Sequence, residues 1–179
     1  MEERINSGLE RSLGAMIGWA KHLLMTHQHK ADFKVDELLD ITRTKACVEV
    51  VGYISTCYTT LVATLDGKNL SEVLKEFGIR LFFLLQNHIQ EYQYTIAGGI
   101  VLLCDLNEYE RVTDRFQVSS VHHLFAALRE LCNLIIIQPE HIRGHCNSEL
   151  STFDHQVVMS FVQLRADYRT AKISKLLQQ

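Results

Sequence analysis

The segment NLSEVLKEFGIRLFFLLQNH, residues 69–88, decides the fold class of this 179-residue chain. Its apolar side chains recur at intervals of three and four residues. They are Leu70, Leu74, Phe77, Leu81 and Leu84, and His88 follows at the same spacing. Because an α-helix has 3.6 residues per turn, this spacing places them all on one face. The segment therefore predicts a long helix with one buried side.

The same period recurs outward from this segment, and no part of the chain shows sustained strand alternation. The other periodic segments are residues 5–23, 47–65, 121–135 and 153–171. The single proline, Pro139, suits the first turn of a short helix and leaves the long ones unbroken. Short connections favour antiparallel neighbours. We therefore expect an all-α fold, an elongated antiparallel bundle of about five main helices. Its last helix would run from Phe153 to Leu177, roughly 37 Å.

Residues typical of helix ends set the expected boundaries. Gly67 suits the left-handed position that closes a helix. Asn69 and Glu72 have the spacing of a capping box, which predicts that the next helix begins at Asn69. Ser151 and Asp154 repeat that spacing before the last helix.

Length and composition favour one domain covering residues 1–179. The net charge of −3 gives no reason to expect a nucleic-acid partner, since phosphate binding needs concentrated Lys and Arg. No apolar run reaches the length of a membrane-spanning helix, and the first residues do not resemble a signal peptide. Five widely spaced cysteines do not form a disulfide or zinc pattern, so we expect reduced thiols and a cytosolic protein.

Motifs of enzymes and cofactor sites are missing from the sequence. His141 and His145 are four residues apart, so a helix would place both rings on one face, next to Cys146. Gly144 is expected to interrupt that helix, and we predict no metal, no cofactor and no catalytic residue. One of His122 and His123 is expected to be a core histidine.

Two adjacent glycines, Gly98 and Gly99, stand in YTIAGGIVLLC, where helical spacing continues. Glycine costs a helix about 1 kcal/mol relative to alanine. The pair indicates either a helix whose backbone comes very close to a neighbour or a break between two shorter helices.

Three basic residues near the end of the chain form the candidate binding site. Arg165, Arg169 and Lys172 are spaced by four and three, which on a helix gives one positive stripe. Three explanations are open. The cations can stabilise the helix C-terminus through its dipole, dock onto an acidic partner, or contact anionic lipid.

Several segments, taken in order, resemble the C-terminal region of the Sec-ten family of exocyst subunits. They are LERSLGAMIGWAKHLL, KADFK, LDGKNLSEVLKEFGIRL, YTIAGGIVLLCDLNEYER, HLFAALRELCNLIIIQPEHI and SFVQLRADYR, spread over residues 9–171. The order of the segments makes the resemblance specific, since none of them is a catalytic signature.

The resemblance implies the end of a longer helical rod in a complex that tethers secretory vesicles to the plasma membrane before fusion. A tether of this kind is not an enzyme. The resemblance also implies other exocyst subunits as partners, particularly the Sec-fifteen subunit, together with small GTPases. The protein would be cytoplasmic and recruited to sites of exocytosis. The alternative function is a peripheral lipid-binding bundle that places Arg165, Arg169 and Lys172 on anionic phospholipid.

Overall fold

A computed structural model describes residues 2–35 and 42–176 of the chain. It contains eight α-helices and one short 3₁₀ helix within these ranges. The five long helices are α1 (Glu2–His27), α2 (Lys45–Thr64), α3 (Gly67–Ile89), α4 (Ile96–Asp114) and α5 (Ser119–Ile136). The shorter elements are η1 (Lys30–Phe33), α6 (Pro139–Ser148), α7 (His155–Val162) and α8 (Ile173–Leu176).

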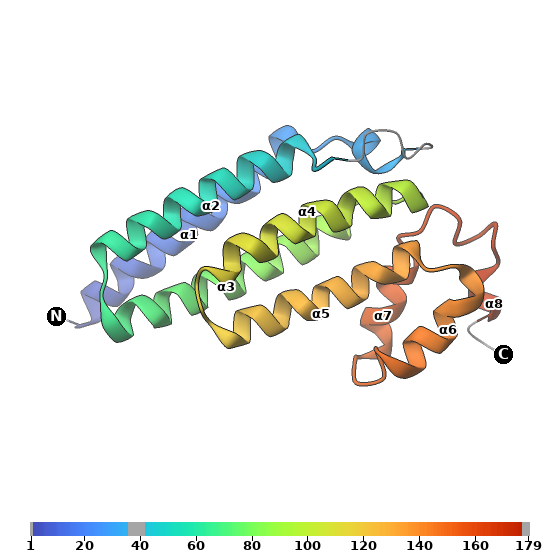
Figure 1. Ribbon diagram of the computed structural model, residues 1–179. Helices are drawn as coiled ribbons and strands as arrows, with labels where there is room; N and C mark the ends of the chain where they lie inside the picture. Colours follow the sequence, from blue (N-terminus) through green and yellow to red (C-terminus); the bar gives the residue numbers. More distant parts are fainter. Residues whose placement is uncertain (1, 36–41, 177–179) are drawn as a thin grey trace.

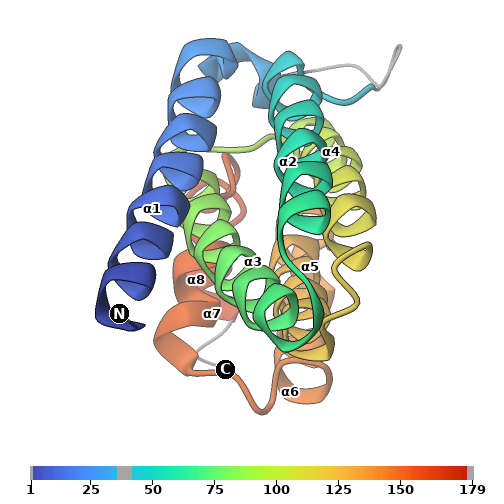
Figure 2. The ribbon, with the colours of Figure 1, turned by 90° about the vertical axis from the view of Figure 1, so that its left-hand side faces the viewer.

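The long helices alternate in direction and form an elongated bundle (Figure 1). The helix α4 packs on both α2 and α5, and α3 packs on both α1 and α5. Figure 2 shows α1, α2 and α3 from one end of the bundle. The short helices gather at the opposite end, where α7 contacts α5 and α6 contacts α8. The prediction of an all-α, antiparallel bundle with about five main helices is confirmed.

The core runs along the length of the bundle and contains aromatic side chains at several levels. Phe77 and Tyr58 both stack on Phe116, with ring centroids 5.8 and 5.7 Å away. Three of the cysteines, Cys47, Cys57 and Cys132, are buried and free, as the sequence predicted. Burial raises the pKa of each of these thiols, so they remain protonated at neutral pH.

Helix α2 is long and apolar enough, by length and composition alone, to cross a membrane. No such segment is expected from the lengths of the apolar runs in the sequence. In this structure one face of α2 is buried against α1 and α4. The buried side chains of that face are Ala46, Cys47, Val50, Ile54, Cys57 and Leu61. Both packing partners are helices of the same bundle, whereas Val48 and Val62 on the rest of α2 are exposed.

The predicted helix ends are confirmed only in part. Helix α3 begins at Gly67, so Asn69 lies inside it and forms no cap. The N-cap of α7 is Asp154, whose carboxylate accepts a hydrogen bond from the Gln156 amide at 2.7 Å. Gly67 has the expected left-handed conformation, with a φ of +47°, but it is the first residue of α3 and does not close α2, which ends at Thr64 with Leu65 as its C-cap. Pro139 opens α6, as predicted.

A buried carboxylate joins α4 to the start of α2. Asp105 is 2% exposed and accepts hydrogen bonds from the backbone amide and the hydroxyl of Thr44, both at 2.7 Å. The Thr44 hydroxyl in turn accepts the Cys47 amide and caps α2. Burial, as the largest cause, raises the pKa of Asp105 from 3.8 to about 6, although the bonds from Thr44 lower it.

This raised pKa predicts that protonation of Asp105 stabilises the fold. Stability is fully present below the unfolded pKa of 3.8 and is lost as pH rises through about 6. The free energy of unfolding of the wild type, relative to Asp105→Asn, should therefore rise by about 2 kcal/mol between pH 7 and pH 4.5. Urea denaturation of both proteins at each pH measures this difference. If the free energies of unfolding of the wild type and Asp105→Asn change with pH in parallel, the Asp105 carboxylate is not responsible for the pH dependence.

Candidate functional site

The segment that carries the three predicted basic residues is not a helix, and this corrects the sequence analysis. Helix α7 ends at Val162, and residues 163–172 form consecutive turns before α8. The prediction of one continuous helix from Phe153 to Leu177 is therefore wrong: only His155–Val162 and Ile173–Leu176 are helical, and Leu177 lies outside the described residues. Arg165 is buried, whereas Arg169 and Lys172 are exposed, and Lys172 has a φ of +53°. The three residues do not form one positive stripe.

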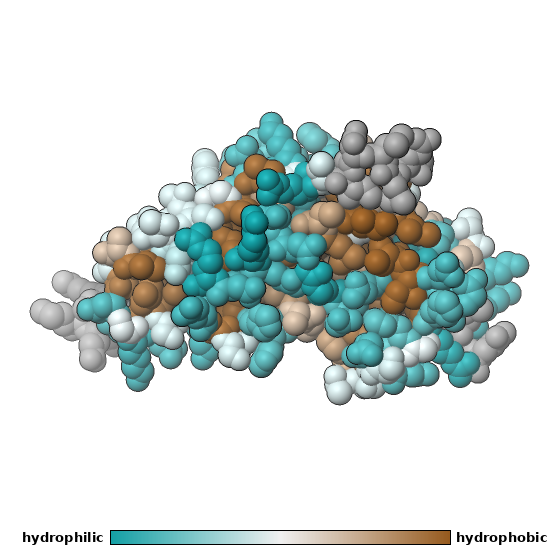
Figure 3. Space-filling view, in the orientation of Figure 1, coloured by the Kyte–Doolittle hydropathy of each residue, from teal (hydrophilic) through white to brown (hydrophobic). Residues whose placement is uncertain are grey.

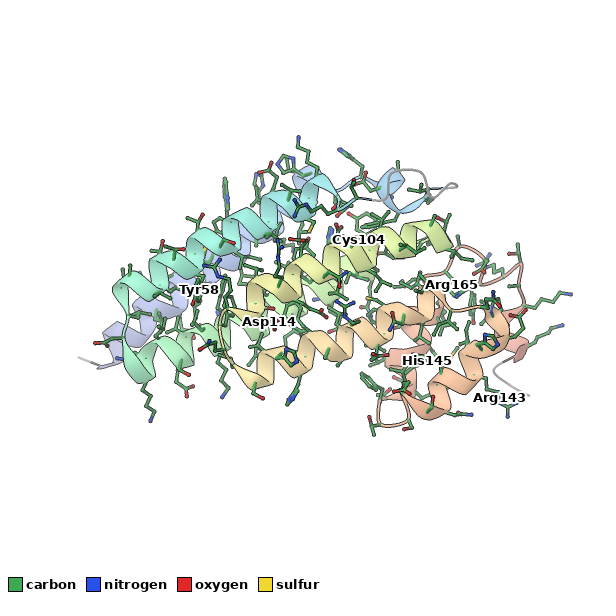
Figure 4. The ribbon with its side chains drawn as sticks, in the orientation of Figure 1. Tyr58, Cys104, Asp114, Arg143, His145 and Arg165 are labelled. Atoms are coloured by element: carbon green, nitrogen blue, oxygen red, sulfur yellow. The ribbon has the colours of Figure 1, made fainter. Side chains whose placement is uncertain are left out.

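The reason for this departure is the set of bonds made by Arg165, whose side chain is 1% exposed. Its Nη1 donates to the carbonyl oxygens of Leu134, Ile135 and Ile137, at 2.9, 3.0 and 2.6 Å. These carbonyls stand at the end of α5, where a helix has unpaired acceptors and negative potential. Figure 4 places Arg165 at this end of the bundle. The guanidinium therefore acts as a C-cap supplied from a distant segment.

The remaining donors of Arg165 are used by Asp167. Nε donates to one carboxylate oxygen and Nη2 to the other, both at 2.8 Å. Such a bidentate pair is stronger and more directional than a neutral hydrogen bond. Because Asp167 is only two residues away, the pair also holds the intervening backbone in a turn.

Tyr94 fixes the same turn from the other side. Its amide donates to the Leu164 carbonyl at 2.9 Å, and its own carbonyl accepts the Ala166 amide at 2.8 Å. The Tyr94 hydroxyl donates to the Ile89 carbonyl at 2.9 Å. The loop before α4 and the segment after α7 are therefore locked together by backbone and side-chain bonds.

The loop before α4 and the segment after α7 meet at a junction, and a third segment, η1, also reaches it. Gly98 and Gly99 explain this close approach. A Cβ built on Gly98 would lie 1.8 Å from the carbonyl oxygen of Phe33, in η1. A Cβ on Gly99 would lie 2.7 Å from the side chain of Ile136. Both glycines lie in the first turn of α4, which is capped by Thr95. Of the two sequence-based alternatives, the close approach of a helix backbone to its neighbours is the correct one.

A polar cavity of about 580 Å³ opens beside the junction. It is lined by Gln93, Gln163, Arg165, Ala166, Tyr168 and Arg169. Of these, Gln93, Gln163, Ala166 and Arg169 are exposed. This cavity is the candidate functional site, and it includes two of the three predicted basic residues. Lys172, the third predicted basic residue, does not line it.

The histidines single out no second site. Helix α6 continues through Gly144, so the predicted interruption there is wrong. His145 lies 3.6 Å from the Glu130 carboxylate, and within the described ranges no three His, Cys, Asp or Glu side chains gather in a way that could hold a metal ion. His122 and His123 are both exposed, which corrects the prediction of a core histidine there.

The buried histidine is instead His88, whose pKa is lowered to about 4 by burial. Its ring packs edge-on against Tyr92 at 5.0 Å between centroids. The helical period had already placed His88 on the buried face of its helix, four residues after Leu84. The buried roles of Asp105 and Arg165 were not predicted, because the period gave no signal for them.

The face of the molecule in Figure 3 is mostly hydrophilic, with a hydrophobic patch near the start of α4. Ile96, the first residue of α4, is 48% exposed. Pairs such as Arg80 with Glu10, at 2.7 Å, connect neighbouring helices on the surface. Surface pairs of this type contribute little to stability and carry no indication of a site.

Comparison with known proteins gives one consistent result. Residues 1–177 match the family model described as "Exocyst complex component Sec10-like, alpha-helical bundle". The chain is 39% identical to human "Exocyst complex component 5" and 35% identical to its Drosophila melanogaster counterpart, over 98% and 99% of its length. It is 30% identical to "Exocyst complex component SEC10a" of Arabidopsis thaliana over 95% of its length.

The matches cover only part of each relative. The chain spans about a quarter of the human and fly proteins, 25% in each case, and 21% of the plant protein. What is similar is therefore one helical-bundle region of a longer polypeptide.

Proposed function

Because this chain belongs to the Sec10-like family of exocyst components, we propose that it acts in vesicle tethering through protein–protein contacts, without catalysing a reaction. It would form the C-terminal part of a longer, rod-shaped exocyst subunit, as one domain over residues 1–179. The observation that carries this proposal is the family match over residues 1–177 of a chain whose described secondary-structure elements are all helices.

The structure supports a role as a rigid docking unit. A tether must transmit force between two membranes, so its modules need stable cores and surfaces of fixed shape. Here four separate segments, η1, the loop before α4, the end of α5 and the turns after α7, are joined by Arg165, Tyr94 and Thr95. The partner surface is thereby built on ordered backbone.

We place the partners among the other exocyst subunits, with the Sec-fifteen subunit first and small GTPases next. The protein would be cytoplasmic and recruited to the plasma membrane at sites of exocytosis. Arg169 and Lys172 remain the candidate contacts, because both are exposed. Arg165 supports them from inside the bundle. Binding of anionic lipid is less favoured, since the stripe of three cations on which that alternative depended is not formed.

Affinity capture from cell lysate tests this proposal. The immobilised chain is expected to enrich identified exocyst subunits relative to a bead control, as measured by quantitative mass spectrometry. The double variant Arg169→Gln, Lys172→Gln should reduce that enrichment several-fold. A matched variant at the far end of the bundle, Lys68→Gln, should leave it unchanged.

Absence of every exocyst subunit from the captured proteins, with circular dichroism showing a folded helical chain, would contradict the proposal. Equal capture by the wild type and the double variant would retain exocyst membership and remove Arg169 and Lys172 from the contact surface.

A further inference from the structure

The geometry points to a more specific role for the polar cavity: it receives a carboxylate side chain from an acidic peptide segment of a protein partner, with Arg169 as the direct contact. This inference deepens the proposed function, on which it rests, by naming the chemistry of the partner at one site. It depends on the charge, the donors and the rigidity of the cavity.

The charge balance of the cavity is positive. Among the described residues, none of those lining it is acidic. Asp167, the nearest carboxylate along the chain, gives both of its oxygens to the buried Arg165. Arg169 is exposed and has no carboxylate partner within the described ranges. Its guanidinium can therefore bind an incoming carboxylate in the bidentate manner that arginine favours.

The other polar groups of the cavity suit the same ligand. The amides of Gln93 and Gln163 and the hydroxyl of Tyr168 can all donate hydrogen bonds. Together with Arg169 they line the cavity with groups that can donate. A carboxylate is an acceptor with two oxygens, so it can satisfy several of these groups at once.

The walls of the cavity are ordered before any partner arrives. Gln93 directly precedes Tyr94, and Gln163 and Ala166 flank the Leu164–Arg165 pair that bonds to Tyr94 and to the end of α5. A preorganised site loses less conformational entropy when it binds. The contact would therefore need no rearrangement of the backbone.

A peptide fits this site better than a membrane does. One exposed arginine in a recess of about 580 Å³ can reach a single side chain that enters it. Peripheral membrane binding needs a cluster of cations spread over a face, because each contributes only about 1 kcal/mol near an anionic surface. Lys172 and Lys175 are the exposed basic residues that follow Arg169 in the described chain, and neither of them lines the cavity.

Selection from a peptide library tests the inference without a known partner. Random heptapeptides displayed on phage are panned on the immobilised wild-type chain and counter-selected on Arg169→Gln. We expect the enriched peptides to share Asp or Glu at a fixed position, and synthetic copies to bind Arg169→Gln at least tenfold more weakly. Replacing that acidic residue by its amide should weaken binding equally, and Lys68→Gln should bind as the wild type does.

Two results would overturn the inference. One is a set of enriched peptides without an acidic position, or with equal affinity for both proteins. The other is Arg169-dependent sedimentation with vesicles of phosphatidylcholine and phosphatidylserine, without any acidic preference among peptides, which would make lipid the occupant. If the chain selects acidic peptides but captures no exocyst subunit, the proposed function is contradicted and this site is not. If it captures exocyst subunits but selects no acidic peptide, only the inference about this site is contradicted.

Discussion

Replacing Arg165 by alanine is expected to lower the free energy of unfolding by about 3–5 kcal/mol, the cost of breaking a buried ion pair from one side. Its side chain is 1% exposed and that of Asp167 is 34% exposed, so solvent is excluded from the bonds to α5 more fully than from the ion pair. The change leaves three carbonyls at the end of α5 without their donor and removes the ion pair with Asp167. Urea denaturation followed by circular dichroism measures the loss.

Arg169→Ala is the matched control for this prediction. It removes the same type of side chain four residues away, from an exposed position, and should change stability by no more than about 0.5 kcal/mol. Arg165→Lys keeps the charge but cannot form the bidentate pair, so it should recover only part of the loss. If Arg165→Ala costs no more than Arg169→Ala does, the cap on α5 is not a stabilising feature.

Gly98→Ala is expected to be comparably damaging, at about 3 kcal/mol or more, although it adds a single methyl group. The new Cβ would lie 1.8 Å from the Phe33 carbonyl oxygen, which already accepts the Thr95 amide at 3.1 Å. A backbone atom held by its own hydrogen bond cannot rotate away as a side chain would. The helix start or η1 must therefore move.

Gly144→Ala provides the opposite outcome in the same assay. Gly144 lies within α6, and nothing stands within 4 Å of a Cβ built there. Alanine should stabilise this helix by up to about 1 kcal/mol, because it has the higher helix propensity. Equal effects at the two glycines would show that propensity, and not the approach of Phe33, determines the result at Gly98.

Four of the five long helices, α1, α2, α3 and α5, could be predicted because their positions depend on local spacing. The fifth, α4, was not among the five main helices predicted, and the segment 153–171 was predicted as a long helix in its place. Leu74, Phe77 and Leu81 are buried where the period of α3 places them. A helix in a bundle buries whichever face is apolar, so the sequence of one segment is enough to identify it. Gly98 and Gly99 were also recognisable, since two glycines near the start of a helix are costly without a packing reason.

The end of the chain could not be predicted in the same way. Phe161, Leu164 and Tyr168 have helical spacing, yet the chain leaves the helix after Val162. The competing interactions come from residues about 30 and 70 positions earlier in the sequence, at the end of α5 and at Tyr94. Local periodicity contains no information about such distant acceptors. The positive stripe of Arg165, Arg169 and Lys172 was also predicted from helical spacing alone, and it fails because the helix does not continue.

The central claim is that residues 163–172 form a fixed, non-helical wall anchored by the buried Arg165. Backbone chemical shifts and amide hydrogen exchange of the isotope-labelled chain measure this directly. We predict non-helical shifts from Gln163 to Lys172 and slow exchange at the amides of Tyr94 and Ala166, which bond across the junction. Continuous helical shifts from His155 to Leu176, with fast exchange at Tyr94, would contradict the account and restore the exposed helix that the sequence suggested.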